Sequence, residues 1–143
     1  MNRRSLLKFA GLIGVGQVAN VGRVAMAAPP TPGASGKGPI VLYCDLAVDP
    51  AREQEMLHHF HHDFKPVAER FDGYIDLKML KIRKVVQGGP PPSKGVNYRF
   101  QLTFESEEKR QIWIASEVHR KNWPLVENTV IDKNYLTLLT DSV

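Results

Sequence analysis

Apolar and polar residues alternate without interruption over residues 97–105, which read NYRFQLTFE. An extended chain turns successive side chains to opposite sides, so this segment has an apolar face and a polar face: Tyr98, Phe100, Leu102 and Phe104 against Arg99, Gln101 and Thr103. Such alternation predicts a half-buried antiparallel strand. Three other apolar segments rich in β-formers have strand length, at residues 40–48, 74–86 and 134–143.

Two segments between these strands have helical spacing of their apolar residues. The first, at 49–71, begins with Asp49 as a cap and Pro50 in the first turn, and the second, at 106–130, begins with Ser106 as a cap. At about 100° per residue, the apolar positions of the first helix gather on one face: Leu57, Phe60, Phe64, Val67, Ala68 and Phe71. The second helix is expected to bury Ala115, Val118, Leu125 and Val126.

The two halves of the domain share one pattern at a constant offset. HHDFKPVAE at 61–69 aligns with HRKNWPLVE at 119–127, and at the same offset the strand at 40–48 aligns with the one at 98–106. The predicted order is βαββαβ, and two βαβ halves of this kind are typical of a ferredoxin-like fold. The sequence therefore predicts an α+β domain over 40–143, with a four-stranded antiparallel sheet and two helices on one face.

Residues 1–27 have the pattern of an export signal. Arg3 and Arg4 open the segment, a modestly apolar stretch follows, and Ala25-Met26-Ala27 resembles a cleavage site. The opening resembles a twin-arginine signal, which predicts a bacterial protein that is periplasmic or secreted. An ordinary secretory signal or an uncleaved anchor are the alternatives. The apolar stretch is too short and weak to remain as a stable membrane span.

Composition changes after this signal. Residues 28–39 are rich in Pro, Gly and Ser, as in a flexible linker. The formal charge of +4 comes from the four basic residues of the signal, and without them 15 basic residues balance 15 acidic ones. A neutral domain gives no electrostatic reason to bind nucleic acid or anionic lipid.

Four of the five histidines lie within residues 58–62. The helical wheel turns His62 away from the core and His58 and His59 to either side, whereas His61 lies on the flank of the apolar face. The repeat places His119 at the position equivalent to His61. His61 and His119 are therefore the candidate catalytic residues, and the alternative is that both form structural hydrogen bonds near the helix prolines.

Metal and cofactor patterns are weak. His58 and His62 are four residues apart and could share a divalent ion, but no third ligand is evident, which favours a surface chelate over a functional metal site. Cys44 lies in a predicted strand and is expected to be a buried, inert thiol. No Gly-rich phosphate loop, zinc-ligand spacing or nucleophilic serine elbow occurs, so no conventional cofactor is expected.

The domain resembles the dimeric α/β-barrel superfamily, and most closely its antibiotic biosynthesis monooxygenase branch. The resemblance rests on the tandem βαβ plan, on FKPVAERFDGYIDL at 64–77, and on FESEEKRQIWIASEVHRKNWPLVEN at 104–128, in which Ser116 precedes His119 by three residues. It implies a homodimer that pairs two sheets through the polar face, which carries Tyr43, Asp45, Arg99, Gln101 and Thr103. The haem-degrading members are a poorer match, because Trp113 and His119 have the wrong separation for their Asn, Trp and His triad.

The resemblance further implies a small apolar pocket between helices and sheet, and oxygenation of a small aromatic or phenolic substrate without a cofactor. His119 would then act as the general base. The candidate substrate-binding residues are Trp113, Ser116, Trp123, Tyr98 and Phe100. The alternatives are a non-enzymatic barrel that binds a small ligand, haem or a metal, and a structural partner of another exported protein.

Overall fold

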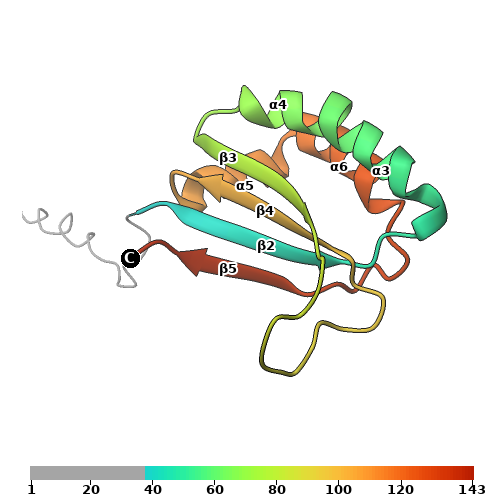
Figure 1. The fold of residues 1–143 in the computed structure, drawn as a ribbon. Coiled ribbons are helices and arrows are strands. Elements are labelled where there is room, and N and C mark those ends of the chain that lie inside the picture. Colours follow the sequence, from blue (N-terminus) through green and yellow to red (C-terminus); the bar gives the residue numbers. More distant parts are fainter. Residues whose placement is uncertain (1–37) are drawn as a thin grey trace, which may run out of the picture. The chain divides into compact units, whose positions relative to one another are not determined.

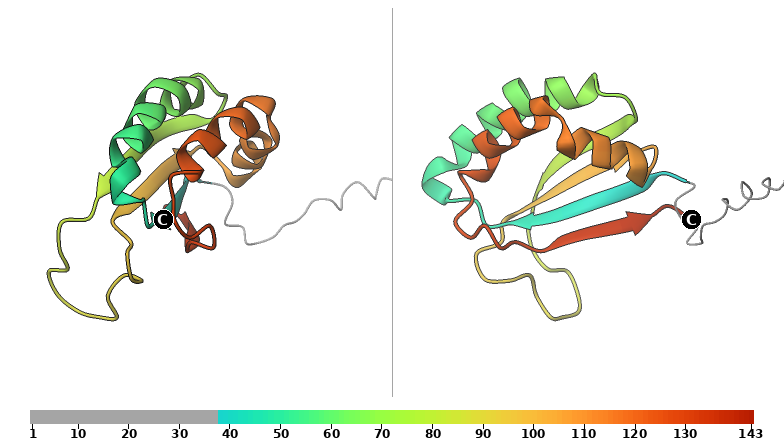
Figure 2. Two further views of the ribbon diagram at one scale, coloured as in Figure 1. Left: turned by 90° about the vertical axis from the view of Figure 1, so that its right-hand side faces the viewer. Right: turned by 180° about the vertical axis from the view of Figure 1, so that it is seen from behind.

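The computed structural model describes residues 38–143, so the expected export signal and nearly all of the expected linker lie outside the described residues. Four strands form one antiparallel sheet in the order β3-β4-β2-β5. They are β2 (Ile40–Leu46), β3 (Tyr74–Lys81), β4 (Tyr98–Phe104) and β5 (Thr137–Asp141). All the long helices lie on one face of this sheet (Figures 1 and 2). The predicted ferredoxin-like α+β fold is confirmed, although β3 and β5 are shorter than expected.

The central strands β2 and β4 carry the repeat and the core. They begin at Ile40 and Tyr98, which are equivalent positions of the two halves, and they pair antiparallel over their whole length. In β4 every second side chain is buried, as the alternation predicted. Because the helices cover this buried face, the leucines of β2 and the phenylalanines of β4 pack with them in one hydrophobic core.

The first helical segment is less regular than predicted. A short 3-10 turn, Pro50–Arg52, leads into α3 (Glu53–His59), a π-helical turn η2 (Phe60–Phe64) and then α4 (Lys65–Glu69). In η2 the amide of Lys65 donates to the carbonyl of Phe60, five residues earlier. Pro66 has no amide hydrogen, so the wider turn ends where a regular ladder would be interrupted anyway. The predicted core residues of this segment all pack in or against the core.

The π turn changes which histidine approaches the core. A helical wheel assumes a constant rotation per residue, and a π turn holds more residues than an α turn. His61 is consequently exposed, and the prediction that it flanks the core is wrong. His59 is half-buried instead, with its Nδ1 2.7 Å from Oδ2 of Asp63.

The second helical segment is divided at Ser116. Helix α5 (Glu107–Ala115) ends and α6 (Glu117–Glu127) begins at this residue, whose extended backbone has φ −73° and ψ 155°. The break rotates α6 relative to a continuous helix. Val118 on α6 is exposed, and Ala115 at the end of α5 is exposed as well, so the predicted burial of both is wrong. Val126 is buried as expected.

The other face of the sheet has no helix over it (Figure 2). The polar residues of β2 and β4 lie on this face, where Arg99 forms a two-pronged ion pair with Asp45, at 2.7 and 3.0 Å, and stacks on the ring of Tyr43. Leu80, Leu136 and Leu138 expose between 40 and 54% of their surface.

Within residues 38–143, no helix is long and apolar enough to cross a membrane.

Candidate functional site

A cavity of about 150 Å³ lies between the sheet and the helices α5 and α6. Its lining comes from parts of the chain that are distant in sequence: strands β2, β4 and β5, the turn η2, the two helices, and the segment before β5. The lining residues are Leu42, Cys44, Phe64, Phe100, Leu102, Arg110, Trp113, Ile114, His119, Trp123, Tyr135 and Thr137. The sequence supplies few polar groups here, so an occupant would be held mainly by apolar and aromatic contact.

Aromatic rings form the walls of this cavity. The ring of Phe64 lies 5.6 Å from Trp113 and 5.2 Å from Trp123, and Phe100 lies 5.0 Å from Trp123. These centroid distances are in the range of favourable edge-to-face and tilted packing. Trp113 is 1% exposed, which makes it part of the core as well as part of the wall.

His119 is the histidine that the fold brings to the cavity. Its ring makes an edge contact with Trp113 at 5.1 Å and is nearly parallel to Trp123 at 6.3 Å. Burial lowers the pKa of His119, and the positive charge of Arg110 lowers it further, while Glu127 opposes them. Within residues 38–143 no protein group hydrogen-bonds to its ring nitrogens. The imidazole is thus neutral near pH 7 and its nitrogens are available to an occupant.

Arg110 is a charged residue that the sequence analysis missed. Its guanidinium is largely buried and binds both carboxylate oxygens of Glu107, at 2.7 and 2.9 Å. These hydrogen bonds from Arg110 lower the pKa of Glu107. Arg110 precedes Trp113 by one helical turn and so lies on the same face, which is the signal that could have identified it.

Three groups from β2 and from the end of the chain complete the polar lining. Thr137 donates its hydroxyl hydrogen to Sγ of Cys44 at 3.7 Å, and burial raises the pKa of the Cys44 thiol to about 11. Such a thiol is not a nucleophile at neutral pH. Tyr135 donates to Oε2 of Glu127 at 2.7 Å, and its pKa is raised by burial and by this carboxylate.

Of the predicted site residues, the fold brings His119, Trp113, Trp123 and Phe100 together around the cavity. Ser116 does not line it. The Ser116 hydroxyl oxygen accepts from the amide of His119 at 3.2 Å, and the hydroxyl donates to the carbonyl of Trp113 at 2.6 Å. Ser116 therefore joins α5 to α6 and positions His119 through the backbone.

Tyr98 and His61 lie elsewhere. Tyr98 is buried near the start of α3, where its hydroxyl donates to Oε2 of Glu53 at 2.6 Å, and burial raises its pKa to about 12. His61 is exposed, with its ring edge against Phe60. Neither residue lines the cavity that contains His119.

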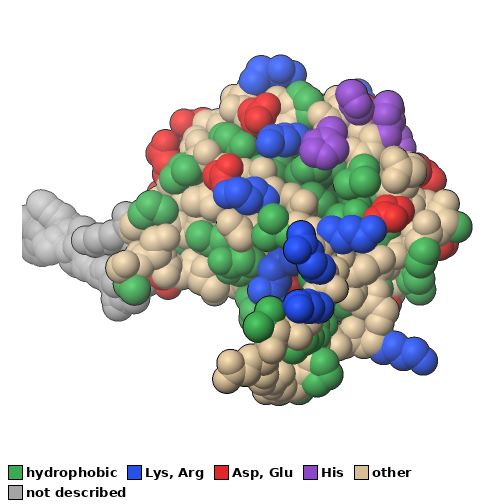
Figure 3. Space-filling model, viewed as in Figure 1, with side chains coloured by type: hydrophobic (Ala, Val, Ile, Leu, Met, Phe, Trp, Pro, Cys, Tyr) green, Lys and Arg blue, Asp and Glu red, His purple; other side chains and the backbone are tan. Residues whose placement is uncertain are grey.

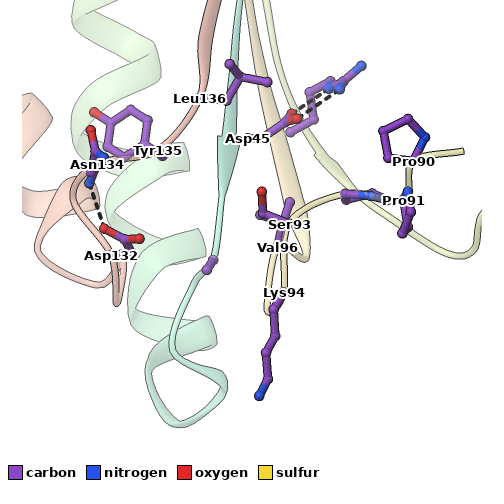
Figure 4. A pocket seen from close by; sticks show the side chains of 13 residues that line it. Asp45, Pro90, Pro91, Ser93, Lys94, Val96, Asp132, Asn134, Tyr135 and Leu136 are labelled. Atoms are coloured by element: carbon purple, nitrogen blue, oxygen red, sulfur yellow. Dashed lines mark hydrogen bonds and ion pairs between the residues drawn. The ribbon is translucent and has the colours of Figure 1, made fainter.

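A second cavity, of about 380 Å³, lies on the sheet face that has no helix. Figure 4 shows it between Tyr135 and Asn134 on one side and the prolines of the β3–β4 loop, Pro90 and Pro91, on the other. The Asp45–Arg99 ion pair lies at its sheet side (Figure 4). Tyr135 lines both cavities and lies between them.

Metal ligands do not gather at either cavity. In the described part of the chain, no cluster of three or more His, Cys, Asp or Glu side chains could hold a metal ion. The side chains that line the smaller cavity can supply proton transfer by His119 and electrostatic stabilisation by Arg110.

Comparison with known proteins places the fold. No family model matches the chain, and no curated protein matches it in sequence. Solved structures do match. A candidate antibiotic biosynthesis monooxygenase from Caulobacter crescentus CB15 superposes with a TM-score of 0.60 at 14% identity, over 75% of this chain and 92% of that one. The chain therefore shares the ferredoxin-like fold of these solved structures.

Two other solved structures have the same fold. SnoaB, a cofactor-independent oxygenase from Streptomyces nogalater, gives a TM-score of 0.52 at 12% identity, over 76% of this chain and 94% of SnoaB. A dimeric ferredoxin-like protein of unknown function from Jannaschia sp. CCS1 gives a TM-score of 0.56 at 14% identity, over 74% of this chain and 99% of that protein. At these identities the likeness shows the shared fold and leaves the activity to be argued from the site.

Proposed function

We propose that this protein is an oxygenase that acts without a cofactor on a small phenolic substrate, with His119 as general base. The observation that carries the proposal is the half-buried His119 imidazole, whose nitrogens have no hydrogen-bond partner within residues 38–143 and which lines an aromatic cavity. The cofactor-independent oxygenase among the fold neighbours adds support.

The chemistry begins with proton transfer. His119 accepts the phenolic proton, and Arg110 stabilises the phenolate through its positive charge. The electron-rich ring then reacts with O₂ at its para carbon to form a peroxide. The peroxide takes a proton from His119, and loss of water leaves a carbonyl group. One phenol and one O₂ thus give one para-quinone and one water.

The size of the cavity restricts the substrate. An engineered cavity of about 150 Å³ in another protein is known to bind benzene, and the cavity here has about that volume. We therefore propose a substrate with one aromatic ring at the reacting end. Larger polycyclic phenols would require Trp123 or Tyr135 to move.

We also propose that the protein is a homodimer that pairs its sheets through the face without helices. The exposed leucines and the ion pair of this face support the proposal, as does the dimeric fold neighbour from Jannaschia. Pairing would enclose the larger cavity beside Tyr135. Light scattering at micromolar concentration that gives the mass of one chain would contradict it.

Export is the remaining part of the proposal. The paired arginines of the first residues support a twin-arginine route. Replacing Arg3 and Arg4 together by lysine is expected to leave the precursor inside a bacterial cell. Unchanged export of that variant would exclude this route.

Oxygen uptake tests the enzymatic proposal. The protein is mixed with single-ring phenols in the presence of a chelator, and ¹⁸O₂ is supplied. One labelled oxygen is expected in the quinone and the other in water. His119→Gln is expected to abolish uptake, whereas the matched change His61→Gln, at an exposed position, is expected to leave it intact.

Binding is measured separately from turnover. Both tryptophans of the chain, Trp113 and Trp123, line the cavity, so intrinsic fluorescence reports on its occupancy. A phenol that quenches this fluorescence without consuming oxygen would contradict the oxygenase and favour a small-ligand binding protein. Full uptake by His119→Gln would refute the role of His119.

A further inference from the structure

The histidine cluster lies outside the cavity and takes no part in the proposed chemistry. His58, His61 and His62 are exposed, and histidine side chains gather on one part of the surface in the space-filling view (Figure 3). His58 is near the end of α3 and His62 is in the π turn η2. Their rings are 4.6 Å apart, centroid to centroid, with planes inclined by 36°.

This separation fits two imidazoles that share one metal ion. A metal–nitrogen bond of about 2.0 Å places the ion about 3.2 Å from each ring centroid. Two rings at a right angle about the ion are then about 4.5 Å apart, and at a tetrahedral angle about 5.2 Å. The observed 4.6 Å is close to the right-angle value, which is the angle between neighbouring ligands in the tetragonal sites that Cu²⁺ prefers.

The neighbouring residues are engaged elsewhere. Oδ2 of Asp63 lies 2.7 Å from Nδ1 of His59, so this carboxylate already has a partner. The ring of His59 lies 5.6 Å from that of His58, centroid to centroid. The ring of His61 has its edge contact with Phe60. His58 and His62 therefore act as two ligands, with water in the remaining positions, in agreement with the absence of a larger ligand cluster within residues 38–143.

We infer that His58 and His62 form a surface site that binds one Cu²⁺ ion in preference to Zn²⁺. His58 and His62 are four residues apart along one continuous helical segment, which holds the two rings at about the separation that a tetragonal ion requires. The order of affinities for divalent metals on nitrogen ligands also favours Cu²⁺ over Zn²⁺. The site is independent of the proposed oxygenase activity.

Calorimetric titration of the full chain with CuSO₄, with glycine as a weak competitor, tests the site. The wild-type protein is expected to bind one equivalent. His58→Ala and His62→Ala are each expected to weaken Cu²⁺ binding at least tenfold. The double variant is expected to bind Cu²⁺ as weakly as either single variant, because either change alone removes the chelate. His61→Ala is the matched control and is expected to stay within twofold of wild type.

Electron paramagnetic resonance identifies the ligands. The Cu²⁺ spectrum of the wild type is expected to show coupling to two imidazole nitrogens, and that of either single variant to fewer. No histidine precedes His58 in the chain, and the segment before it is the same in every variant, so the comparison isolates the pair. Unchanged binding by the double variant, an equal loss in His61→Ala, or tighter binding of Zn²⁺ than of Cu²⁺ would each overturn the inference.

Discussion

Ser116 offers a test of how the helix break positions the site. Its hydroxyl oxygen accepts the amide hydrogen of His119 at 3.2 Å, and its hydroxyl also donates to the carbonyl of Trp113 at 2.6 Å. Ser106 caps α5 through the same kind of bond, to the amide of Lys109 at 3.2 Å, at a distance from the cavity. Replacing each serine by alanine therefore compares two helix caps with the same distance between amide nitrogen and hydroxyl oxygen, and only the Ser116 cap adjoins the candidate base.

The expected magnitudes follow from these bonds. Loss of a serine N-cap lowers the free energy of unfolding by about 1 kcal/mol, which is the expectation for Ser106→Ala. Ser116→Ala also removes the hydroxyl hydrogen bond to the Trp113 carbonyl, which keeps the backbone amide of residue 116 as a donor at 3.1 Å. The loss of this hydrogen bond adds about 0.5–1.5 kcal/mol at most. For a domain of this size each kcal/mol corresponds to a fall in Tm of about 4 °C.

Urea denaturation and a fluorescence titration with a single-ring phenol measure the two effects. Both variants are expected to unfold at lower urea concentration, Ser116→Ala more so. Only Ser116→Ala is expected to weaken phenol binding and to shift the NMR titration of His119, because only that break carries the histidine.

Two results would refute this reasoning. If Ser116→Ala is as stable as wild type while Ser106→Ala is not, the serine does not cap α6. If Ser116→Ala keeps its stability but loses phenol binding, the hydroxyl contacts the ligand directly, as the sequence analysis expected.

Three further predictions concern ionisable groups. Burial lowers the pKa of His119, so the unfolded state binds a proton more readily than the folded state. The free energy of unfolding is therefore expected to fall as the pH drops below about 6.5, the ordinary histidine value. His119→Gln is expected to make this fall smaller in urea titrations between pH 7.5 and 5. The Cys44 thiol, with a pKa of about 11, is expected to react with a disulfide reagent at pH 8 only after unfolding, and fast reaction of the native protein would show that it is not buried. Glu107→Gln weakens the ion pair with the largely buried guanidinium of Arg110 and is expected to lower the free energy of unfolding by about 1–3 kcal/mol. The matched change Glu55→Gln, in an exposed ion pair with Arg52, is expected to lower it by less than about 1 kcal/mol. Equal losses of stability in thermal denaturation would refute this difference.

The sheet could be predicted from the sequence because strand periodicity is a local property. Alternation along β4 depends only on which side chains face a core, and β2 occupies the equivalent place in the first half of the repeat, so the two central strands were correctly expected. The order of elements then left the ferredoxin-like arrangement as the natural way to bury both apolar faces. Trp113, Trp123 and Phe100 were expected as cavity walls from the family resemblance, and the fold brings all three to the cavity.

The irregular helices were decided only by tertiary packing. A π turn at Phe60–Phe64 and a break at Ser116 each interrupt the constant rotation that a helical wheel assumes, and neither could be predicted from the local sequence pattern. The wheel therefore misplaced His61 and Val118, and the equivalence of His61 to His119 holds in sequence and fails in space.

The polar lining of the cavity also required the folded chain. Arg110, Tyr135 and Thr137 come from a helix, a loop and an edge strand, and each resembles an ordinary surface residue in sequence. They meet His119 because β5 pairs with β2 beneath α6, and this contact joins the first strand of the domain to its last. The periodicity of the sequence predicts which face of its own helix or strand a side chain lies on. The site depends on how the helices and strands pack against one another, and this packing involves residues from the whole domain.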